Sequence, residues 1–360
     1  MFHKKKELVW AVGLLLPTAV DSLSKLKPGK QIVLLLTALL IHWTANVLRP
    51  AQSTYGSTWQ AFLAEPEDSL DVIYLGSSYA YCDVNPALVY DSSALTGFVM
   101  AGGEQPLSVT YWYLREILRT QSPAAVVLEG TGVFFDTYQN YTKQNVSMMP
   151  FSVNRLGAIF TAAEPELRQG LLFDLYFYHD RWREVGTADA KRALGLDQWD
   201  AYKGFTPMAG VLDGVGETPV VADRPVAPEV YGDNLAWLGK ILTLCRENGI
   251  QAIVAFHPSY TRCTAETYAR IGEEIRAMDP DVIFRDWSAD FAQIGLIPTE
   301  HLYDGGHLNR EGAAVFSAWL GRELTEELGL TPRPQTAENA AAWLSAAERW
   351  KDGADSVPPL

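Results

Sequence analysis

The sequence predicts an α/β fold: a doubly wound, flavodoxin-like sheet of five parallel strands with a helical insertion, preceded by one transmembrane helix. Three observations lead to this prediction. Short apolar runs alternate with helical patterns over most of the chain, which is the signature of βαβ units. Irregular, aromatic-rich sequence interrupts the alternation between 131 and 228, as an insertion over the carboxyl edge of the sheet would. Before all of this lies 31–48, eighteen residues without a formal charge.

The five expected strands are short apolar runs bounded by turn residues or by helical patterns. Their sequences are DVIYLG at 71–76, GFVMAG at 97–102, AAVVLEG at 124–130, QAIVAFHPS at 251–259 and DVIFRDWS at 281–288. Helices are expected at 106–120, 234–248, 265–278 and about 309–328, and helix-like pieces at 165–185 within the insertion. The first of these helices opens on Pro106, and proline suits the first helical position. The main domain is therefore expected at 69–330, after a linker at 49–68, with a helical tail at 331–360.

The uncharged segment 31–48 is predicted to be a membrane span. At about 1.5 Å per residue it is just long enough to cross a bilayer core of about 30 Å. Six lysines precede it and only Arg49 closely follows, so the positive-inside rule places 1–30 on the cytoplasmic side and the main domain outside. A cleaved signal peptide is the alternative interpretation. The shorter apolar stretch 8–20 contains a proline and is read as interfacial, while a two-span hairpin with a changed topology stays open.

Charge and cysteine content exclude several classes of function. Residues 1–50 carry seven Lys and Arg against two acidic residues, so the net charge of −14 leaves −19 on the remaining 310 residues. Such a domain would repel nucleic acid. Six histidines without HExxH and three cysteines without CxxC predict no metal site, and no glycine fingerprint predicts a cofactor. One disulfide between Cys82 and Cys263 is compatible with an outside location.

Two motifs carry the expected chemistry. The first expected strand ends in Gly76-Ser77-Ser78, where the serines either cap the next helix or present Ser78 as a nucleophile. Asp304 and His307 stand three residues apart before the last expected helix, a spacing that lets the carboxylate orient the imidazole. Because the carboxyl ends of parallel strands share one edge, the two motifs can meet there. We therefore expect a Ser78–His307–Asp304 triad, although Asp304 could also close a turn or cap that helix.

These residues resemble the SGNH, or GDSL-type, hydrolase superfamily. The GSS turn matches its nucleophile motif and DGGH matches its Asp-x-x-His motif. The MAGGEQPL stretch is similar to its glycine block, which implies that the amides of Ser78 and Gly103, with Gly102 as the alternative to Gly103, form the oxyanion hole. The family's asparagine after the third strand is absent from LEGTGVFFD. This departure points to the membrane-anchored branch, which is similar in layout to the D-alanyl transfer protein of teichoic acid modification and the alginate acetylation proteins.

The resemblance implies a membrane-anchored, extracytoplasmic serine acyl esterase or O-acyltransferase that needs no cofactor. Its expected partners are an acylated envelope polymer or glycan, a membrane-bound O-acyltransferase, and the bilayer around 31–48. The alternative is a catalytically inert domain that binds polysaccharide or scaffolds such an acyltransferase. His257 is the second candidate base, and His179, Arg181 and Trp182 could contact an anionic or sugar substrate. Packing is the competing interpretation for all four residues.

Overall fold

The computed structural model describes residues 25–49, 59–194 and 202–351. The chain forms two compact units. One contains the helix before residue 49 together with 174–194, and the other contains the remaining described residues, including the sheet. The predicted interfacial stretch 8–20 lies outside the described residues.

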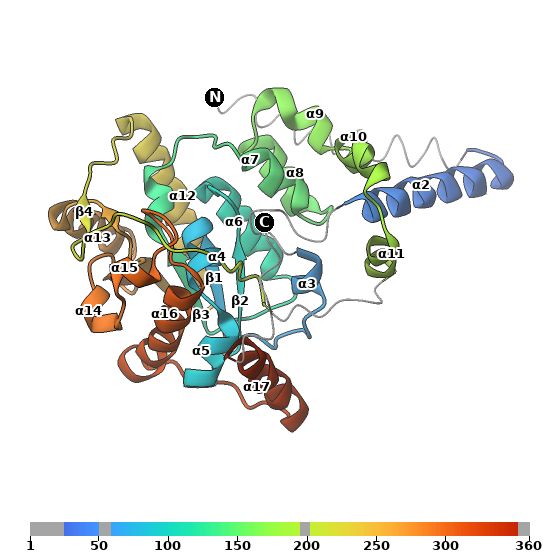
Figure 1. The fold of residues 1–360 in the computed structure, drawn as a ribbon. Helices are drawn as coiled ribbons and strands as arrows, with labels where there is room; N and C mark the ends of the chain where they lie inside the picture. Colours follow the sequence, from blue (N-terminus) through green and yellow to red (C-terminus); the bar gives the residue numbers. More distant parts are fainter. Residues whose placement is uncertain (1–24, 50–58, 195–201, 352–360) are drawn as a thin grey trace. The chain divides into compact units, whose positions relative to one another are not determined.

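The larger unit is built on five parallel strands in the order β2-β1-β3-β5-β7 (Figure 1). Their bounds are β1 Val72–Gly76, β2 Gly97–Ala101, β3 Ala125–Glu129, β5 Gln251–Phe256 and β7 Ile283–Asp286. All five predicted strands are present, and the predicted α/β fold class is confirmed. A second sheet of two residues per strand, β4 Val220–Val221 with β6 Thr261–Arg262, was not predicted.

Helices cover both faces of the sheet, which explains why its strands are apolar on both sides. All five residues of β1 are buried, and so are those of β2 and β3. Helices α5 and α16 pack together on one face, and α6 and α12 pack together on the other (Figure 1). The bounds in this layer system are α3 Trp59–Leu63, α4 Ser78–Asp83, α5 Pro86–Ser93, α6 Leu107–Ile117, α12 Pro228–Glu247, α13 Ala265–Met278, α14 Phe291–Ile294, α15 Pro298–His301, α16 Arg310–Arg322 and the π-helical η4 Glu323–Glu327.

The C-terminal helix α17, Ala337–Lys351, is part of the packed domain rather than a peripheral tail. It lies against α5, and its Trp343 stacks on Tyr90 with ring centroids 5.3 Å apart. Ala347 and Trp350 join the main hydrophobic core. The small alanine side chains let the two helices approach closely, so the helix buries its apolar stripe against the domain.

The insertion consists of short helical pieces rather than long helices. Its elements are η1 Gly130–Phe134, α7 Thr142–Met148, α8 Val153–Thr161, η2 Pro165–Leu167, α9 Arg168–Leu171, α10 Asp174–Tyr178, η3 His179–Arg183, α11 Thr187–Ala193 and strand β4. The helix-like pieces expected over 165–185 are present as η2, α9, α10 and η3. Gly170 lowers helix propensity within that stretch, and the helical structure is interrupted between α9 and α10.

The smaller unit is organised around α2, Pro28–Leu48, the one helix among the described residues that is long and apolar enough to span a membrane. Its side chains between Ile32 and Trp43 are largely exposed, 57% for Ile32 and 47% for Trp43. Such a continuous apolar surface is not typical of a helix that faces water. Helices α10 and α11 pack against α2, where Ala45 and Leu48 are buried.

Candidate active site

The turn after β1 places two serines at the carboxyl edge of the sheet. Gly76 has φ = +140°, and a Cβ there would meet the Glu129 Cβ at 2.8 Å, so glycine is required. Ser77 occupies the N-cap of α4 but makes no capping hydrogen bond; its Oγ donates to Glu129 Oε2 at 3.1 Å. Ser78 is the first residue of α4 and is half-buried. The helix-cap interpretation of the two serines is therefore wrong for their side chains.

The structure brings Ser78, His307 and Asp304 together, as the two motifs predict. His307 Nε2 lies 2.7 Å from Ser78 Oγ, although 229 residues separate them. His307 Nδ1 lies 2.9 Å from both Asp304 carboxylate oxygens. Asp304 Oδ1 also accepts from the backbone N–H groups of Gly306 and His307, at 2.7 and 2.9 Å. The carboxylate is thereby fixed by its own loop, and it holds the imidazole with Nε2 directed at the serine hydroxyl.

The electrostatics of this group favour an ionised Asp304 and a basic His307. Burial works against the charged imidazole, but the hydrogen bond and charge of Asp304, with Asp83 and Glu129 further away, raise the pKa of His307. Burial also works against the Asp304 carboxylate, yet the His307 ring and the two backbone amides outweigh it and lower the pKa of Asp304. His307 is thus a stronger base than an ordinary histidine.

The loop after β2 carries the glycines expected to stabilise an oxyanion. Ala101, the last residue of β2, pairs with Gly76 of β1, so the loop that starts at Gly102 lies beside the turn that carries Ser77 and Ser78. Asn145 from α7 donates its side-chain amide to the Gly103 carbonyl at 2.9 Å. A Cβ on Gly102 would lie 2.2 Å from Asn145 Oδ1, so the asparagine packs directly on this loop. The sequence does not predict a role for Asn145, because it lies 42 positions from Gly103 and no local pattern links the two.

His257, the second candidate base, is buried and belongs to a different pair. Its side chain is 1% exposed, and its Nδ1 lies 3.2 Å from Asp83 Oδ2 and 3.3 Å from the Tyr79 carbonyl oxygen. Asp83 Oδ1 accepts from the backbone N–H of Leu308 at 3.0 Å. Asp83 therefore connects α4, which begins at Ser78, with the loop after β5 and the residue that follows His307. The structure does not bring His257 to the Ser78 hydroxyl.

The remaining predicted contact residues lie in the smaller unit. Arg181 bonds to the Leu48 carbonyl at the end of α2 and forms ion pairs with Glu184 and Asp189, at 3.3 and 3.7 Å. His179 bonds to the Tyr176 carbonyl oxygen at 2.7 Å and forms an ion pair with Asp180. Trp182 is 64% exposed and stacks under Arg183. The contacts of Arg181 join the segment 174–194 to α2.

Cysteine and metal chemistry have no assembled site in the described part of the chain. Cys82, Cys245 and Cys263 are all free and buried, so the disulfide considered between Cys82 and Cys263 is not formed. Burial raises the pKa of the Cys245 thiol to about 12, which suppresses the nucleophilic thiolate. Among the described residues no group of three or more His, Cys, Asp and Glu side chains could hold a metal ion.

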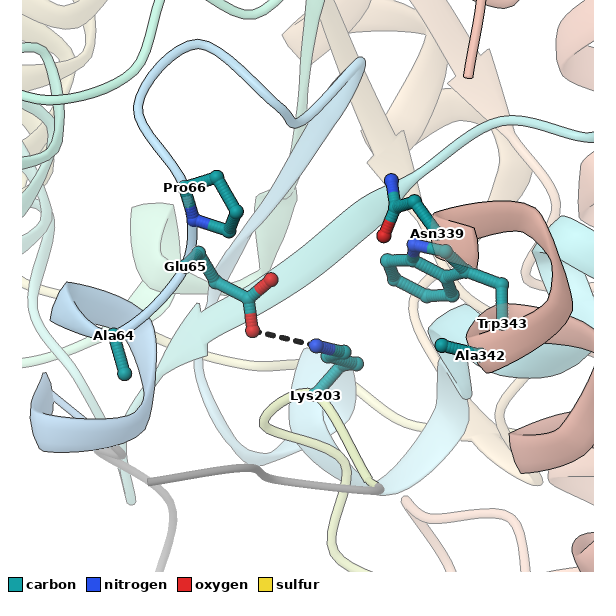
Figure 2. Close-up of a pocket in the computed structure, with 7 residues that line it drawn as sticks. All are labelled: Ala64, Glu65, Pro66, Lys203, Asn339, Ala342 and Trp343. Atoms are coloured by element: carbon teal, nitrogen blue, oxygen red, sulfur yellow. Dashed lines mark hydrogen bonds and ion pairs between the residues drawn. The ribbon is translucent and has the colours of Figure 1, made fainter. Parts of the chain in front are cut away.

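A separate hollow of about 280 Å³ lies between the end of α3 and α17 (Figure 2). Lys203 projects into it and forms an ion pair with Glu65 at 2.5 Å, while the Trp343 ring lies 5.0 Å from the ammonium. The Lys203 carbonyl also accepts from Val99 in edge strand β2. The hollow thus surrounds a charge that Glu65 compensates, on a loop whose backbone bonds to edge strand β2.

Comparison with known proteins gives little beyond this geometry. No family model and no curated protein matches the chain. A solved structure from Bacteroides fragilis, described as a candidate acylhydrolase, is similar to it with 14% sequence identity and a TM-score of 0.36. The likeness covers 76% of this chain and 95% of that one. A TM-score of this size carries no argument about activity, so the functional argument depends on the residues themselves.

Proposed function

We propose that this chain is a serine acyl esterase or O-acyltransferase of the SGNH type, with Ser78 as nucleophile, His307 as general base and Asp304 as the residue that orients it. The observation that carries the proposal is the 2.7 Å separation of His307 Nε2 and Ser78 Oγ, with Asp304 on the opposite ring nitrogen. Nucleophile, base and orienting carboxylate within hydrogen-bond reach are the signature of activated-serine catalysis.

In the proposed reaction, His307 Nε2 takes the Ser78 proton while Ser78 Oγ attacks the ester carbonyl carbon. The tetrahedral intermediate collapses as His307 returns that proton to the departing alcohol oxygen, which leaves an acyl group on Ser78. Water or a sugar hydroxyl then gives its proton to His307 and attacks the acyl carbon, and Ser78 regains its proton. Asp304 stays ionised throughout and stabilises the imidazolium that forms in each half-reaction.

The proposed oxyanion donors are the backbone amides of Ser78 and Gly103, with Gly102 as the alternative glycine. The Ser78 amide is the first of α4 and has no intrahelical partner, and the Ser77 hydroxyl does not cap the helix because it bonds to Glu129. Asn145 supports a role for this loop because it holds the Gly103 carbonyl and packs directly on Gly102, so the segment that carries both candidate amides is fixed in place. Preorganised donors of this kind are often the largest single contribution to such catalysis.

We further propose that the enzyme is anchored by α2 with its N-terminus in the cytoplasm and acts outside on acyl esters of an envelope polymer or glycan. A membrane-bound O-acyltransferase is the proposed protein partner, by resemblance to the membrane-anchored SGNH branch. The exposed apolar surface of α2 supports the anchor, and the excess of lysine before it supports the orientation. The buried native cysteines permit a clean test. A cysteine introduced at Ser57 should react with an impermeant maleimide in intact cells, and protection there would reverse the proposed orientation.

The alternative is an inert domain of the same fold that binds polysaccharide or scaffolds an acyltransferase. The observation that favours it is the missing asparagine after β3, where Glu129 instead bonds to Ser77 and Thr131. Such a domain would have no need of a basic histidine within reach of a half-buried serine.

Labelling with a fluorophosphonate probe separates the two proposals, because only an activated serine reacts quickly with it. The wild-type chain should label, Ser78→Ala should not, and Ser77→Ala is the matched control that removes a neighbouring hydroxyl. Absence of labelling in the folded wild-type chain across the pH range would favour the inert domain.

A further inference from the structure

Arg224 lies beside the proposed catalytic histidine, on the far side of one tyrosine ring. Its Nη2 donates to Tyr79 Oη at 2.8 Å and to the Thr261 carbonyl oxygen at 3.1 Å. The guanidinium carbon stands 5.6 Å from the Tyr79 ring centroid, and that ring is 5.0 Å from the ring of His307. Tyr79 directly follows Ser78, so the cation, the base and the nucleophile form one continuous group.

The backbone before Arg224 is fixed to the segment 260–262 that follows β5. Val220 donates to the Tyr260 carbonyl at 2.6 Å and Ala222 donates to the Arg262 carbonyl at 2.9 Å, within the small β4–β6 sheet. Arg224 follows two residues after the second of these bonds. The insertion therefore delivers this side chain to a defined place, as a specific contact requires.

The charge of Arg224 is not neutralised by its neighbours. No carboxylate among the described residues forms an ion pair with it, and its hydrogen-bond acceptors are a phenol and a peptide carbonyl. Burial raises the pKa of Tyr79, and burial raises that of nearby Tyr268 to about 12, so both phenols are neutral. Glu129 makes the smallest of the contributions that raise the pKa of Arg224, and its carboxylate accepts hydrogen bonds from Ser77 and Thr131. A half-buried guanidinium with neutral partners favours an incoming anion.

The position of Arg224 also indicates which part of a substrate would meet it. His307 must return a proton to the departing alcohol oxygen, so the alcohol part of the ester lies on the His307 side of Ser78. Arg224 is reached from His307 through Tyr79, on that same side. The carbonyl oxygen of the ester faces the proposed amide donors instead.

We propose that Arg224 forms an anion-binding subsite for the alcohol part of the ester, so that the preferred substrate carries a carboxylate or phosphate near the acylated hydroxyl. This inference rests on the proposed esterase function for its catalytic meaning. The shared chemistry is a planar or tetrahedral oxyanion that accepts from a guanidinium fork, and an acidic sugar or a phosphorylated sugar both provide it.

The test compares 4-acetoxybenzoate with its neutral isostere 4-acetoxybenzamide, and with 4-acetoxyphenyl phosphate as the phosphate probe. The ratio of kcat/KM for the anionic ester to that for the neutral ester is measured in each variant. Comparing this ratio between variants cancels the intrinsic difference in reactivity between the two esters. Arg224→Gln should lower the ratio about 10- to 100-fold, the range expected for a hydrogen bond to a charged group. Urea unfolding of each variant reports intact folding independently of turnover. Whichever anionic ester has the larger wild-type ratio identifies carboxylate or phosphate as the preferred group.

Arg270→Gln is the matched control. Arg270 stands at the same 5.6 Å from a tyrosine ring, that of Tyr231, but its charge is paired with Glu274 at 3.1 Å. It should leave the ratio at the wild-type value, and Arg224→Lys should retain part of the preference. An unchanged ratio in Arg224→Gln, or an equal fall in Arg270→Gln, would overturn the subsite.

Calorimetric binding of 4-hydroxybenzoate and 4-hydroxybenzamide separates this inference from the proposed function. If the wild-type chain turns over none of the esters but binds the benzoate more tightly than Arg224→Gln does, the esterase proposal fails and the anion subsite stands. If the esters are hydrolysed without any dependence of rate or binding on Arg224, the subsite fails and the esterase proposal stands.

Discussion

Two aspartate–histidine pairs lie near the carboxyl edge of the same sheet, and only one of them is open to solvent. In the pair of His307 with Asp304 the side chains are 22% and 44% exposed, whereas in the pair of His257 with Asp83 they are 1% and 0% exposed. His307 Nε2 reaches the Ser78 hydroxyl, but the buried His257 Nε2 has no hydrogen-bond partner among the residues that the structure describes. The same two residue types thus form a proposed proton relay in one place and a structural connection in the other.

The pKa values of the two carboxylates are shifted in opposite directions, in line with their different exposure to solvent. Asp304 gains two backbone donors from its own loop, and its pKa is lowered despite burial. Burial dominates for Asp83 and raises its pKa, although His257, His307 and the Leu308 amide oppose the shift. An aspartate next to a histidine is therefore not by itself evidence of a catalytic pair. Access to solvent and a hydroxyl on the free ring nitrogen make the distinction.

The largest expected effect comes from removing the nucleophile or its base. Ser78→Ala and His307→Ala should each lower kcat about 10⁴- to 10⁶-fold, and the double variant should be no worse than the single ones, because such residues act as a unit. His257→Ala is the comparison variant and should retain far more activity per folded molecule. Ester hydrolysis gives the rate, and active-site titration gives the fraction of active molecules where labelling is retained. Additive losses in the double variant would show that Ser78 and His307 have separate roles.

Asp304→Asn tests the orienting carboxylate with almost no change in shape. Loss of the charge and of the correct imidazole tautomer should lower kcat about 10⁴-fold. Stability should change little, because the Asp304 side chain is 44% exposed and the asparagine oxygen can still accept from the loop amides. Activity is measured beside urea unfolding. Near wild-type turnover in the folded variant would remove Asp304 from the proposed triad.

Asp83→Ala should lower stability and spare the reactivity of Ser78, the reverse of the effect expected for Asp304→Asn. The substitution leaves His257 and the Leu308 amide without their buried partner, and breaking a buried pair typically costs about 3 to 5 kcal/mol of stability. Fluorophosphonate labelling of the molecules that remain folded should persist, because Ser78 and His307 are untouched. A variant that keeps full stability but loses labelling would mean that Asp83 belongs to the chemistry.

The raised pKa of His307 should affect activity and stability differently, because catalysis needs the neutral ring whereas the attraction to Asp304 needs the protonated one. Because the pKa of His307 is raised, the acid limb of kcat/KM should lie above its ordinary value of 6.5, with activity falling about tenfold per pH unit below it. Stability should move the other way. The attraction between protonated His307 and Asp304 is fully present below the unfolded pKa and is lost as pH rises through the folded one. Denaturation measured at the same pH values tests this, and His307→Gln should abolish that stability change. An acid limb at or below 6.5 would contradict the raised pKa.

The contrast between the pairs also marks how far the sequence alone could reach. The five strands, the GSS turn and the spacing of Asp304 and His307 are local patterns, and the shared edge of a parallel sheet brings the two motifs together. The pair of Asp83 with His257 joins residues 174 positions apart, and no local sequence pattern predicts that they meet. No local pattern predicts the place of Arg224 either, because it lies in an irregular Gly- and Pro-rich stretch whose position depends on a two-residue strand.

The smallest expected effect on activity is that of Ser77→Ala, the neighbour of the proposed nucleophile. The sequence allows a helix cap as the alternative role of the two serines, but the Ser77 hydroxyl reaches from the end of β1 to the buried Glu129 on β3. Its removal deprives that carboxylate of one donor, which typically costs about 1 to 3 kcal/mol, while Ser78 keeps its hydrogen bond to His307. The variant should therefore unfold at lower urea concentration and still turn over within about tenfold of wild type. Thr131, which also donates to Glu129, provides the control, since Thr131→Val should lower stability in the same way. If Ser77→Ala folds normally and is as inactive as Ser78→Ala, the hydroxyl that reacts has been assigned to the wrong serine.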